Sequence, residues 1–205
     1  MDIIKKLAQE LAIKEEQAKA AVQLIDEGNT IPFIARYRKE MTGALNDETL
    51  RNLHERLLYL RNLEEKKEQV INAITDQGKM TEDLKKKILS AETLVAVDDL
   101  YRPYRPKKQT RATKAKEKGL EPLANILLLQ KTTKSMEEEA AAFVNAEKGV
   151  ANAKEAIAGA KDIIAEMIAD MADYRKSIRN CTMKQGSLVV KAKDEKAESV
   201  YEMYY

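Results

Sequence analysis

The sequence predicts an all-α protein with at most one short β element. Apolar residues recur at spacings of mostly three and four over long segments, which is the period of an α-helix. The seven glycines and four prolines stand mostly where these helical patterns begin or end. Only residues 187–192 have the short, β-branched character of a strand. We therefore expect a long helical hairpin region followed by a helix-turn-helix-like subdomain.

The longest predicted helix covers residues 47–77. Its apolar residues lie on one stripe of a 3.6-residue helix: Leu50, Leu53, Leu57, Leu60, Leu63, Val70, Ile71 and Ile74. A helix of about 30 residues extends about 45 Å, which is longer than a compact domain of this size needs. We expect it to project as one arm of a hairpin. Its partner is either residues 15–27 or residues 82–90, which follow Thr81 as a suitable N-cap.

A shorter helix is expected before it, within residues 31–44 (IPFIARYRKEMTGA). Pro32 fits the first helical turn, where its missing N–H costs nothing. Arg36, Arg38 and Lys39 would end the helix near the negative end of its dipole, and Gly43 would supply a turn. We interpret these cations as structural groups that cap or bridge helices, although a ligand site is the alternative.

The most informative segment for chemistry is residues 101–118 (YRPYRPKKQTRATKAKEK). Its eight basic residues and single acid give a charge of +7, so the other 187 residues carry −5. Prolines should keep the first half extended, so that its cations reach successive phosphates while its two tyrosines stack on bases or hold the loop to the core. The alternative is a solvated loop paired with acidic helices of the same chain. The candidate nucleic-acid contacts are Arg102, Arg105, Lys107, Lys108 and Arg111.

Residues 162–192 have a different organisation. A helix with an apolar face is followed by a short break at residues 170–172 and by a second, basic helix with Tyr174, Ile178 and Cys181 on its expected buried face. This layout is typical of a helix-turn-helix unit, and an ordinary helical hairpin is the alternative. The candidate contacts of this second patch are Arg175, Lys176 and Arg179.

The composition excludes several classes of protein. Among 205 residues, 34% are charged and 44% apolar, which is typical of a soluble globular protein. No apolar run is long enough for a membrane span and the start lacks the apolar core of a signal peptide, so we expect a cytoplasmic protein without a membrane partner. The single cysteine, Cys181, and the single histidine, His54, exclude an internal disulfide and a Cys- or His-rich metal site.

No catalytic motif is present. The sequence lacks a glycine-rich phosphate loop, HExxH and GxSxG. Asp98 and Asp99 could recruit Mg²⁺, but a two-metal site needs more converging carboxylates, and Asp99 more simply caps a turn or pairs with the nearby arginines. We expect a protein that is not an enzyme, with no catalytic residues, no metal and no cofactor, and we expect His54 to have a packing or surface role.

Three stretches carry a family resemblance. Residues 31–47 (IPFIARYRKEMTGALND), 76–81 (DQGKMT) and 98–124 (DDLYRPYRPKKQTRATKAKEKGLEPLA) resemble the signatures of the bacterial transcription accessory protein Tex family. The sequence departs from the family pattern at Arg102, where a more apolar residue is usual, and at Lys108-Gln109, where a basic pair is usual. The resemblance implies a helix-turn-helix-like unit near residues 162–192. It also implies downstream ribonuclease-H-like, helix-hairpin-helix and oligonucleotide-binding-fold domains.

We accordingly expect three parts. Residues 1–130 form an N-terminal helical region with the long helix at 47–77 and the basic loop at 101–111. Residues 131–192 form the helix-turn-helix-like subdomain, and tyrosine-rich residues 193–205 begin a helix that leads to the downstream domains of a longer protein.

The first functional hypothesis is a non-catalytic region that binds the backbone of RNA or DNA and takes part in transcription. The alternative is a structural and protein-interaction scaffold that docks on the downstream domains or on the transcription machinery, with RNA polymerase as a possible partner.

Overall fold

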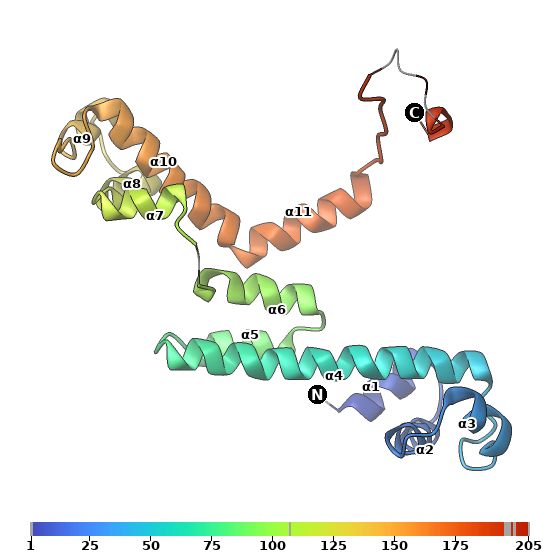
Figure 1. The fold of residues 1–205 in the computed structure, drawn as a ribbon. Coiled ribbons are helices and arrows are strands. Elements are labelled where there is room, and N and C mark those ends of the chain that lie inside the picture. Colours follow the sequence, from blue (N-terminus) through green and yellow to red (C-terminus); the bar gives the residue numbers. More distant parts are fainter. Residues whose placement is uncertain (1, 107, 195–197, 199, 205) are drawn as a thin grey trace. The chain divides into compact units, whose positions relative to one another are not determined.

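The computed structural model describes residues 2–106, 108–194, 198 and 200–204. Within these residues the chain forms eleven α-helices and two short 3-10 helices, with one isolated bridge between Asn145 and Val150 and no strand (Figure 1). The all-α prediction is therefore confirmed. The chain divides into two compact units, Met1–Arg105 and Pro106–Tyr205, and each is described by itself below.

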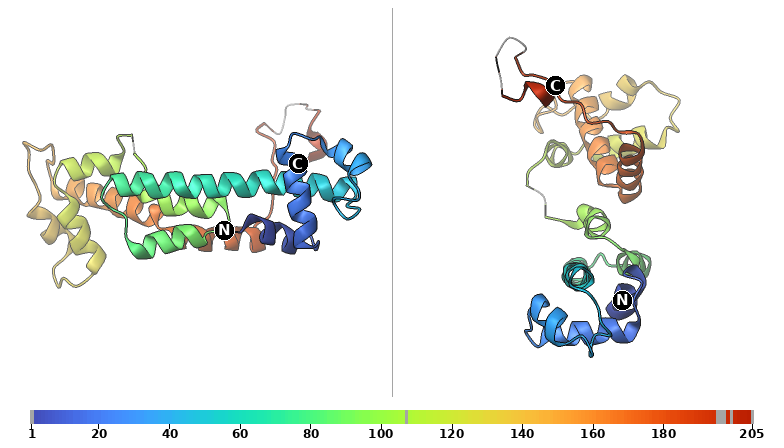
Figure 2. Two further views of the ribbon diagram at one scale, coloured as in Figure 1. Left: turned by 90° about the horizontal axis from the view of Figure 1, so that it is seen from below. Right: turned by 90° about the vertical axis from the view of Figure 1, so that its right-hand side faces the viewer.

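Helix α4 (Asp47–Asp76) is the spine of the first unit, and Figure 2 shows it lengthwise and nearly end-on. It begins where the Asn46 side chain accepts a hydrogen bond from the Thr49 N–H at 2.7 Å. It ends before Gly78, whose φ of +66° is the left-handed conformation that glycine adopts without a Cβ penalty. The predicted bounds of this helix were thus correct to within one residue.

Other helices cover both halves of α4. Its first half buries leucines against α1 (Ile3–Glu10), α2 (Glu15–Asp26) and α3 (Ile31–Tyr37). Its second half packs with α5 (Glu82–Ser90) and α6 (Leu94–Tyr101). The sequence left two partners open for the long helix, and the structure uses both. The helix is therefore packed along its length and does not project as a free arm.

Polar contacts add to this packing. The Arg56 guanidinium donates two hydrogen bonds to the Glu10 carboxylate of α1, and Arg61 donates two, both at 2.7 Å, to Asp26 of α2. Such fork-to-fork pairs fix direction as well as distance. They therefore orient α1 and α2 on the same stretch of α4.

In the second unit, α7 (Arg111–Glu117), α8 (Glu121–Leu129) and α9 (Met136–Ala141) pack on α10 (Ala153–Asp170). Gly159 lies in the middle of α10, where glycine normally weakens a helix. A Cβ at this position would lie 2.4 Å from the Leu120 Cδ1 atom and 3.2 Å from the Ala115 Cβ. Glycine therefore allows α10 to approach α7 and the turn that follows it.

Two predictions for the end of the chain were wrong. Residues 187–192 form no strand, and Cys181, Tyr174 and Ile178 are exposed instead of forming a buried face. Helix α11 (Ala172–Gln185) leaves α10 after Met171, which has an extended backbone, and no residue of α11 is buried. An apolar stripe predicts a face that can be covered, but burial also needs a neighbouring element, and among the described residues none covers this one.

The prolines of the basic segment also behave differently from the prediction. We expected the first half of residues 101–118 to be extended, but Arg102–Tyr104 form the 3-10 helix η1, directly after α6. A proline in the first turn of a helix is compatible with its fixed φ and missing N–H. Extended backbone begins only at Arg105, with φ −65° and ψ 134°.

The last predicted helix falls partly on residues 195–197 and 199, which lie outside the described residues. The described part of the C-terminal segment contains only the 3-10 helix η2 (Glu202–Tyr204). The predicted subdomain boundary after residue 130 lies inside the second unit and stays a prediction.

Candidate nucleic-acid interface

The basic segment crosses the division between the two units, so its residues are described in two groups. In the first unit, Arg102 lies in η1 and Arg105 follows it, and both side chains are exposed. Tyr101 and Tyr104 pack against the core formed by α4, α5 and α6, and the Gln77 amide donates a hydrogen bond to the Tyr104 carbonyl at 3.0 Å. The sequence left two roles open for these tyrosines, stacking on bases or holding the segment to the core. The structure places them in the second role.

In the second unit, the cations of α7 line a groove beside α10. Thr110 caps the helix by accepting a hydrogen bond from the Thr113 N–H at 3.0 Å. Arg111, Lys114 and Lys118 follow at spacings of three and four and so share one face of α7. They border a groove of about 270 Å³. The other residues that line it are Ala115, Leu120, Val150, Glu155, Ala158, Gly159 and Asp162.

The cations of this face are only weakly neutralised. The Arg111 Nη2 atom lies 3.4 Å from the Asp162 Oδ1 atom, and the Arg111 side chain is 87% exposed. An exposed ion pair of this kind contributes only about 0–1 kcal/mol. The Lys118 ammonium donates to the Gly149 carbonyl at 2.8 Å, while the Lys114 side chain has no hydrogen bond or ion pair with any described residue. Arg111 and Lys114 can therefore turn to an anion at little energetic cost.

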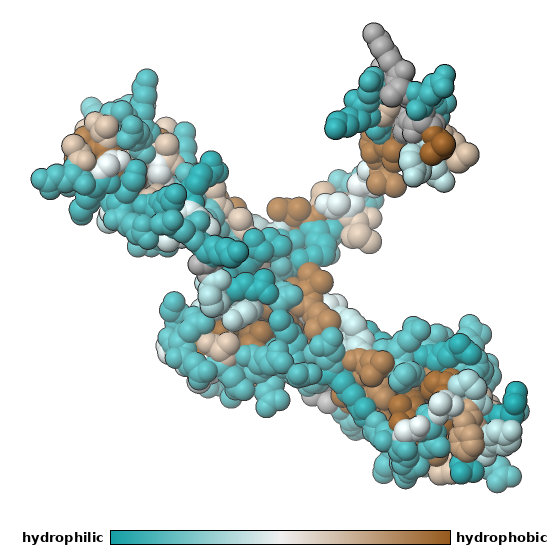
Figure 3. All heavy atoms as spheres, in the orientation of Figure 1, coloured by the Kyte–Doolittle hydropathy of each residue, from teal (hydrophilic) through white to brown (hydrophobic). Residues whose placement is uncertain are grey.

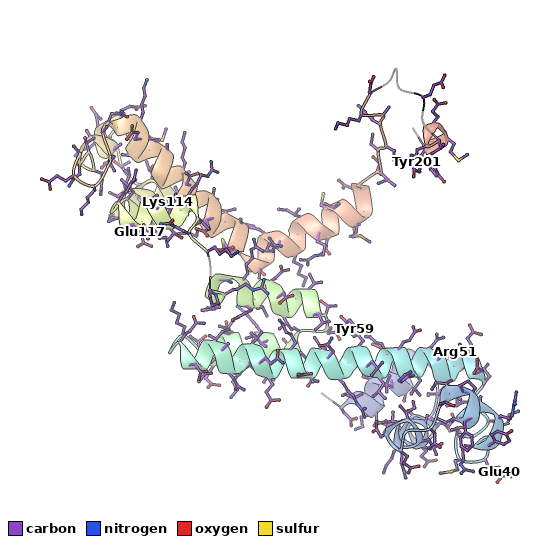
Figure 4. The ribbon with its side chains drawn as sticks, in the orientation of Figure 1. Glu40, Arg51, Tyr59, Lys114, Glu117 and Tyr201 are labelled. Carbon is purple, nitrogen blue, oxygen red and sulfur yellow. The ribbon has the colours of Figure 1, made fainter. Side chains whose placement is uncertain are left out.

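The other cations of the segment differ in whether they are paired. Lys108 is exposed and makes no ion pair with a described residue, as is also true of Arg105. Lys107 lies outside the described residues. Lys116, which was not among the predicted contacts, pairs with Glu121 at 3.0 Å. Figure 4 labels Lys114 and Glu117, the one acid of the segment, and Glu117 does not line the groove.

The second predicted patch lies on α11. Lys176 is exposed, and Arg175 and Arg179 are half-buried one helical turn apart. The Arg175 guanidinium donates to the Ala169 carbonyl at the end of α10, at 3.3 Å. Asp162, which pairs with Arg111, is eight residues before the end of α10, or about 12 Å along its axis. The patch on α11 is thus a separate surface from the α7 groove.

Sequence reasoning missed Lys114 and Lys118 as site residues, although it counted their charge. The signal that could have found them is the spacing 111, 114, 118, which places three cations on one face of a short helix. It could not have found Glu155 and Asp162, because these acids come from α10 and reach the groove only through the tertiary fold.

No group of three or more His, Cys, Asp or Glu side chains is placed to hold a metal ion within the described residues. Asp99 is buried in α6, and His54 is half-buried in α4. No helix of the described chain is both long and apolar enough to cross a bilayer.

Comparisons with known proteins match nearly the whole chain. The Tex-like protein N-terminal domain matches residues 1–75, and the Tex central region-like family matches residues 131–205. The chain is 43% identical to protein YdcI of Bacillus subtilis (strain 168) over 202 residues. This alignment covers 97% of the chain and 28% of YdcI. It is 41% identical over 201 residues to the transcriptional accessory protein Tex of Neisseria gonorrhoeae, covering 97% and 26%.

A more distant relative is the human S1 RNA-binding domain-containing protein 1. It is 32% identical over 186 residues, which are 90% of this chain and 18% of that protein. The chain thus spans less than a third of the length of each of these relatives. The two matched regions lie before and after the basic segment. The alignments to YdcI and to the Neisseria gonorrhoeae protein cover 97% of the chain and so include that segment as well. The chain therefore belongs to the Tex family, matching its N-terminal domain and central region.

Proposed function

We propose that this chain is a non-catalytic region of a transcription accessory protein and binds the sugar-phosphate backbone of RNA or DNA. The observation that carries the proposal is the exposed face of α7, on which Arg111 has one long ion pair and Lys114 has none among the described residues. Exposed Arg105 and Lys108 extend the same basic segment. A relative named as a transcriptional accessory protein and another named for an S1 RNA-binding domain agree with this class of function.

The pairing of the cations separates this proposal from the scaffold hypothesis. A basic segment neutralised by carboxylates of its own chain would favour a scaffold, whereas open cations favour a polyanion. Lys116 is paired with Glu121, but Arg105, Lys108 and Lys114 have no carboxylate partner among the described residues. The charge of these three residues is therefore available to a ligand.

The test is fluorescence anisotropy with labelled single-stranded and duplex oligonucleotides at rising salt. The variant R111Q/K114Q removes two cations from the α7 face, and K85Q/K86Q removes two exposed cations from α5 as a matched control. The slope of log K against log salt is negative, and each lost phosphate contact makes it shallower by about 0.7–0.9. We expect R111Q/K114Q to reduce the magnitude of the slope by about 1.5 and the control to leave it unchanged. Equal slopes for wild type and R111Q/K114Q would refute the proposal.

The alternative proposal is a scaffold that docks on downstream domains or on RNA polymerase. It is supported by large exposed apolar residues on and after α11, among them Ile178, Met183 and Leu188. A pull-down with the downstream domains of a full-length relative tests it, and recovery of nothing would count against docking.

The helix-turn-helix interpretation of residues 131–192 stays a further proposal. It is supported by the tight link between α10 and α11 at Met171 and by the cations of α11. If α11 reads DNA, Lys176→Gln should weaken binding to duplex DNA more than to single strands.

A further inference from the structure

Helix α3 and the loop after it present aromatic rings and cations to solvent. Phe33 is 37% exposed, Tyr37 61% and Met41 51%. The two rings are tilted, with their centroids 5.2 Å apart, and the Arg38 guanidinium lies 5.3 Å from the Phe33 centroid. Figure 3 shows apolar atoms in brown over α3, bordered by hydrophilic residues in teal. The residues of this surface are different from those of the basic segment. Phe33, Tyr37 and Met41 do not pack into any hydrophobic core of the described residues.

The cations of the surface have no acidic partners in the part of the chain that the structure describes. Arg36, Arg38 and Lys39 are exposed, and none forms an ion pair with a described residue. We expected these cations to cap or bridge helices. The Arg38 guanidinium donates to the carbonyl of Tyr37, the last residue of α3, at 3.5 Å and lies over the Phe33 ring, while no hydrogen bond or ion pair of these cations with another helix is found among the described residues. The one acid between residues 31 and 46 is Glu40, labelled in Figure 4 at the outer edge of this loop. The local charge is therefore positive.

A buried scaffold fixes the shape of this surface. Thr42 is fully buried, and its hydroxyl donates to the Arg38 carbonyl at 3.2 Å. The Gln17 amide donates to the Thr42 and Gly43 carbonyls at 3.2 and 2.9 Å. Gly43 and Ala44 both have left-handed backbones, with φ near +60°. A loop held in this way loses little conformational freedom when it binds a ligand.

We propose that this surface, formed by Phe33, Arg36, Tyr37, Arg38, Lys39 and Met41, binds single-stranded nucleic acid. Unpaired bases would stack on the exposed ring faces, and Arg36 and Lys39 would contact the neighbouring phosphates. Binding sites for single strands combine cations with aromatic platforms because every base has a stackable face. A duplex hides those faces, and a second copy of the chain would bring the same positive charge, so both fit the surface less well.

The inference rests on the proposed function in that the ligand is nucleic acid, but it uses residues of the other compact unit. The two ideas therefore fail separately. The α7 face should respond to charge alone, whereas the α3 surface should respond to the presence of bases.

The first experiment uses the full 205-residue chain and two labelled strands of twelve nucleotides, one of thymidines and one abasic. The variant is Tyr37→Leu, and the control is Tyr201→Leu, which removes a comparably exposed tyrosine from the C-terminal segment. We expect Tyr37→Leu to weaken binding of the thymidine strand about tenfold. Binding of the abasic strand, and both affinities of the control, should be unchanged. Equal affinity of wild type and Tyr37→Leu for the thymidine strand would overturn the inference.

Loss of base-dependent binding in Tyr37→Leu, together with no effect of R111Q/K114Q on either strand, would refute the proposed role of α7 and keep this inference. The reverse pattern would keep the role of α7 and overturn the inference.

Photo-crosslinking supplies a second readout that does not depend on affinity. A strand containing 5-bromouracil is irradiated with the chain, and cleavage after Glu27 and Glu40 releases residues 28–40 as one peptide. We expect the adduct on this peptide. Adducts confined to other peptides would overturn the inference. An acidic peptide added as a competitor distinguishes a protein partner. If the peptide binds at Tyr37 while the strand crosslinks only to other parts of the chain, the surface binds a protein and the inference is overturned as well.

Discussion

The Lys67 ammonium donates a hydrogen bond to the Leu89 carbonyl at 2.9 Å and so joins the middle of α4 to the end of α5. The lysine is only 2% exposed, and it also donates to the Glu64 carboxylate at 2.8 Å. The last carbonyls of a helix have no partner within the helix, so this side chain satisfies one that α5 leaves open. A buried charge of this kind is stable because it is paired.

We expect Lys67→Ala to lower the free energy of unfolding by about 2–4 kcal/mol, because it removes a buried side chain and leaves the Leu89 carbonyl without its donor. The matched control is Lys66→Ala, since Lys66 is partly exposed and its pair with Asp98 is 3.5 Å long. That change should cost less than about 1 kcal/mol. Urea unfolding followed by circular dichroism measures both, and equal effects would contradict the role given to Lys67.

Stability should fall in acid because of the pairs that orient α1 and α2. Hydrogen bonds from Arg56 lower the pKa of Glu10 below its usual value, and those from Arg61 do the same to the pKa of Asp26. A carboxylate with a lowered pKa in the folded state stabilises the fold fully above its unfolded pKa, about 4. This stabilisation is lost as the pH falls through the lower folded pKa.

Urea midpoints between pH 6 and pH 2.5 test this expectation. The R56Q/R61Q variant should lose stability at pH 6 and show a smaller further loss in acid than the wild-type chain. Asp26 is about half exposed, so its share of the effect should be the smaller one. Parallel pH profiles for the two proteins would count against these pairs.

Gly159→Ala should destabilise the second unit although alanine is the better helix former. The added methyl would meet Leu120, which is 1% exposed and has little room to move, and the Ala115 methyl group. Overpacking of this kind costs about 1–3 kcal/mol. Thermal unfolding should show a lower midpoint for Gly159→Ala, and Leu120→Val in the same chain should restore part of it. An unchanged or higher midpoint would mean that α10 does not approach α7 this closely.

The exposed face of α11 can be tested through Cys181. Because this thiol is exposed, the folded chain should react with dithionitrobenzoate at a rate within a few-fold of the urea-unfolded chain. A rate at least a hundredfold slower in the folded chain would show that α11 is covered, as its apolar stripe had suggested.

Local signals were sufficient for most of the fold. The bounds of α4 follow from its apolar spacing and from the glycine after it, and the start of α5 follows from the N-cap at Thr81, so each signal is local to the helix that it bounds. The errors arose where the outcome depends on distant groups. The burial of Lys67 depends on the end of α5, and the exposure of Cys181 depends on the lack of a covering element among the described residues.

The cations of the candidate site could be predicted from the sequence, but their ion pairs could not. The sequence located the cations of residues 101–118, and their spacing on α7 would have added Lys114. Which of them are neutralised could not be predicted, because the Asp162 partner of Arg111 lies 51 positions along the chain from it. The α3 surface was overlooked for a related reason, since only the fold shows that Arg36 and Lys39 form no ion pair with a described residue.

The fit between Gln17 and Gly43 links the variation of two positions 26 residues apart. A Cβ at position 43 would lie 2.7 Å from the Gln17 Nε2 atom, so a larger residue there would displace the Gln17 amide from the two carbonyls that it holds. The positive φ at this position would also oppose the substitution. Neither position can change alone without cost, which makes the pair a conserved unit to look for whenever sequences of this family are compared.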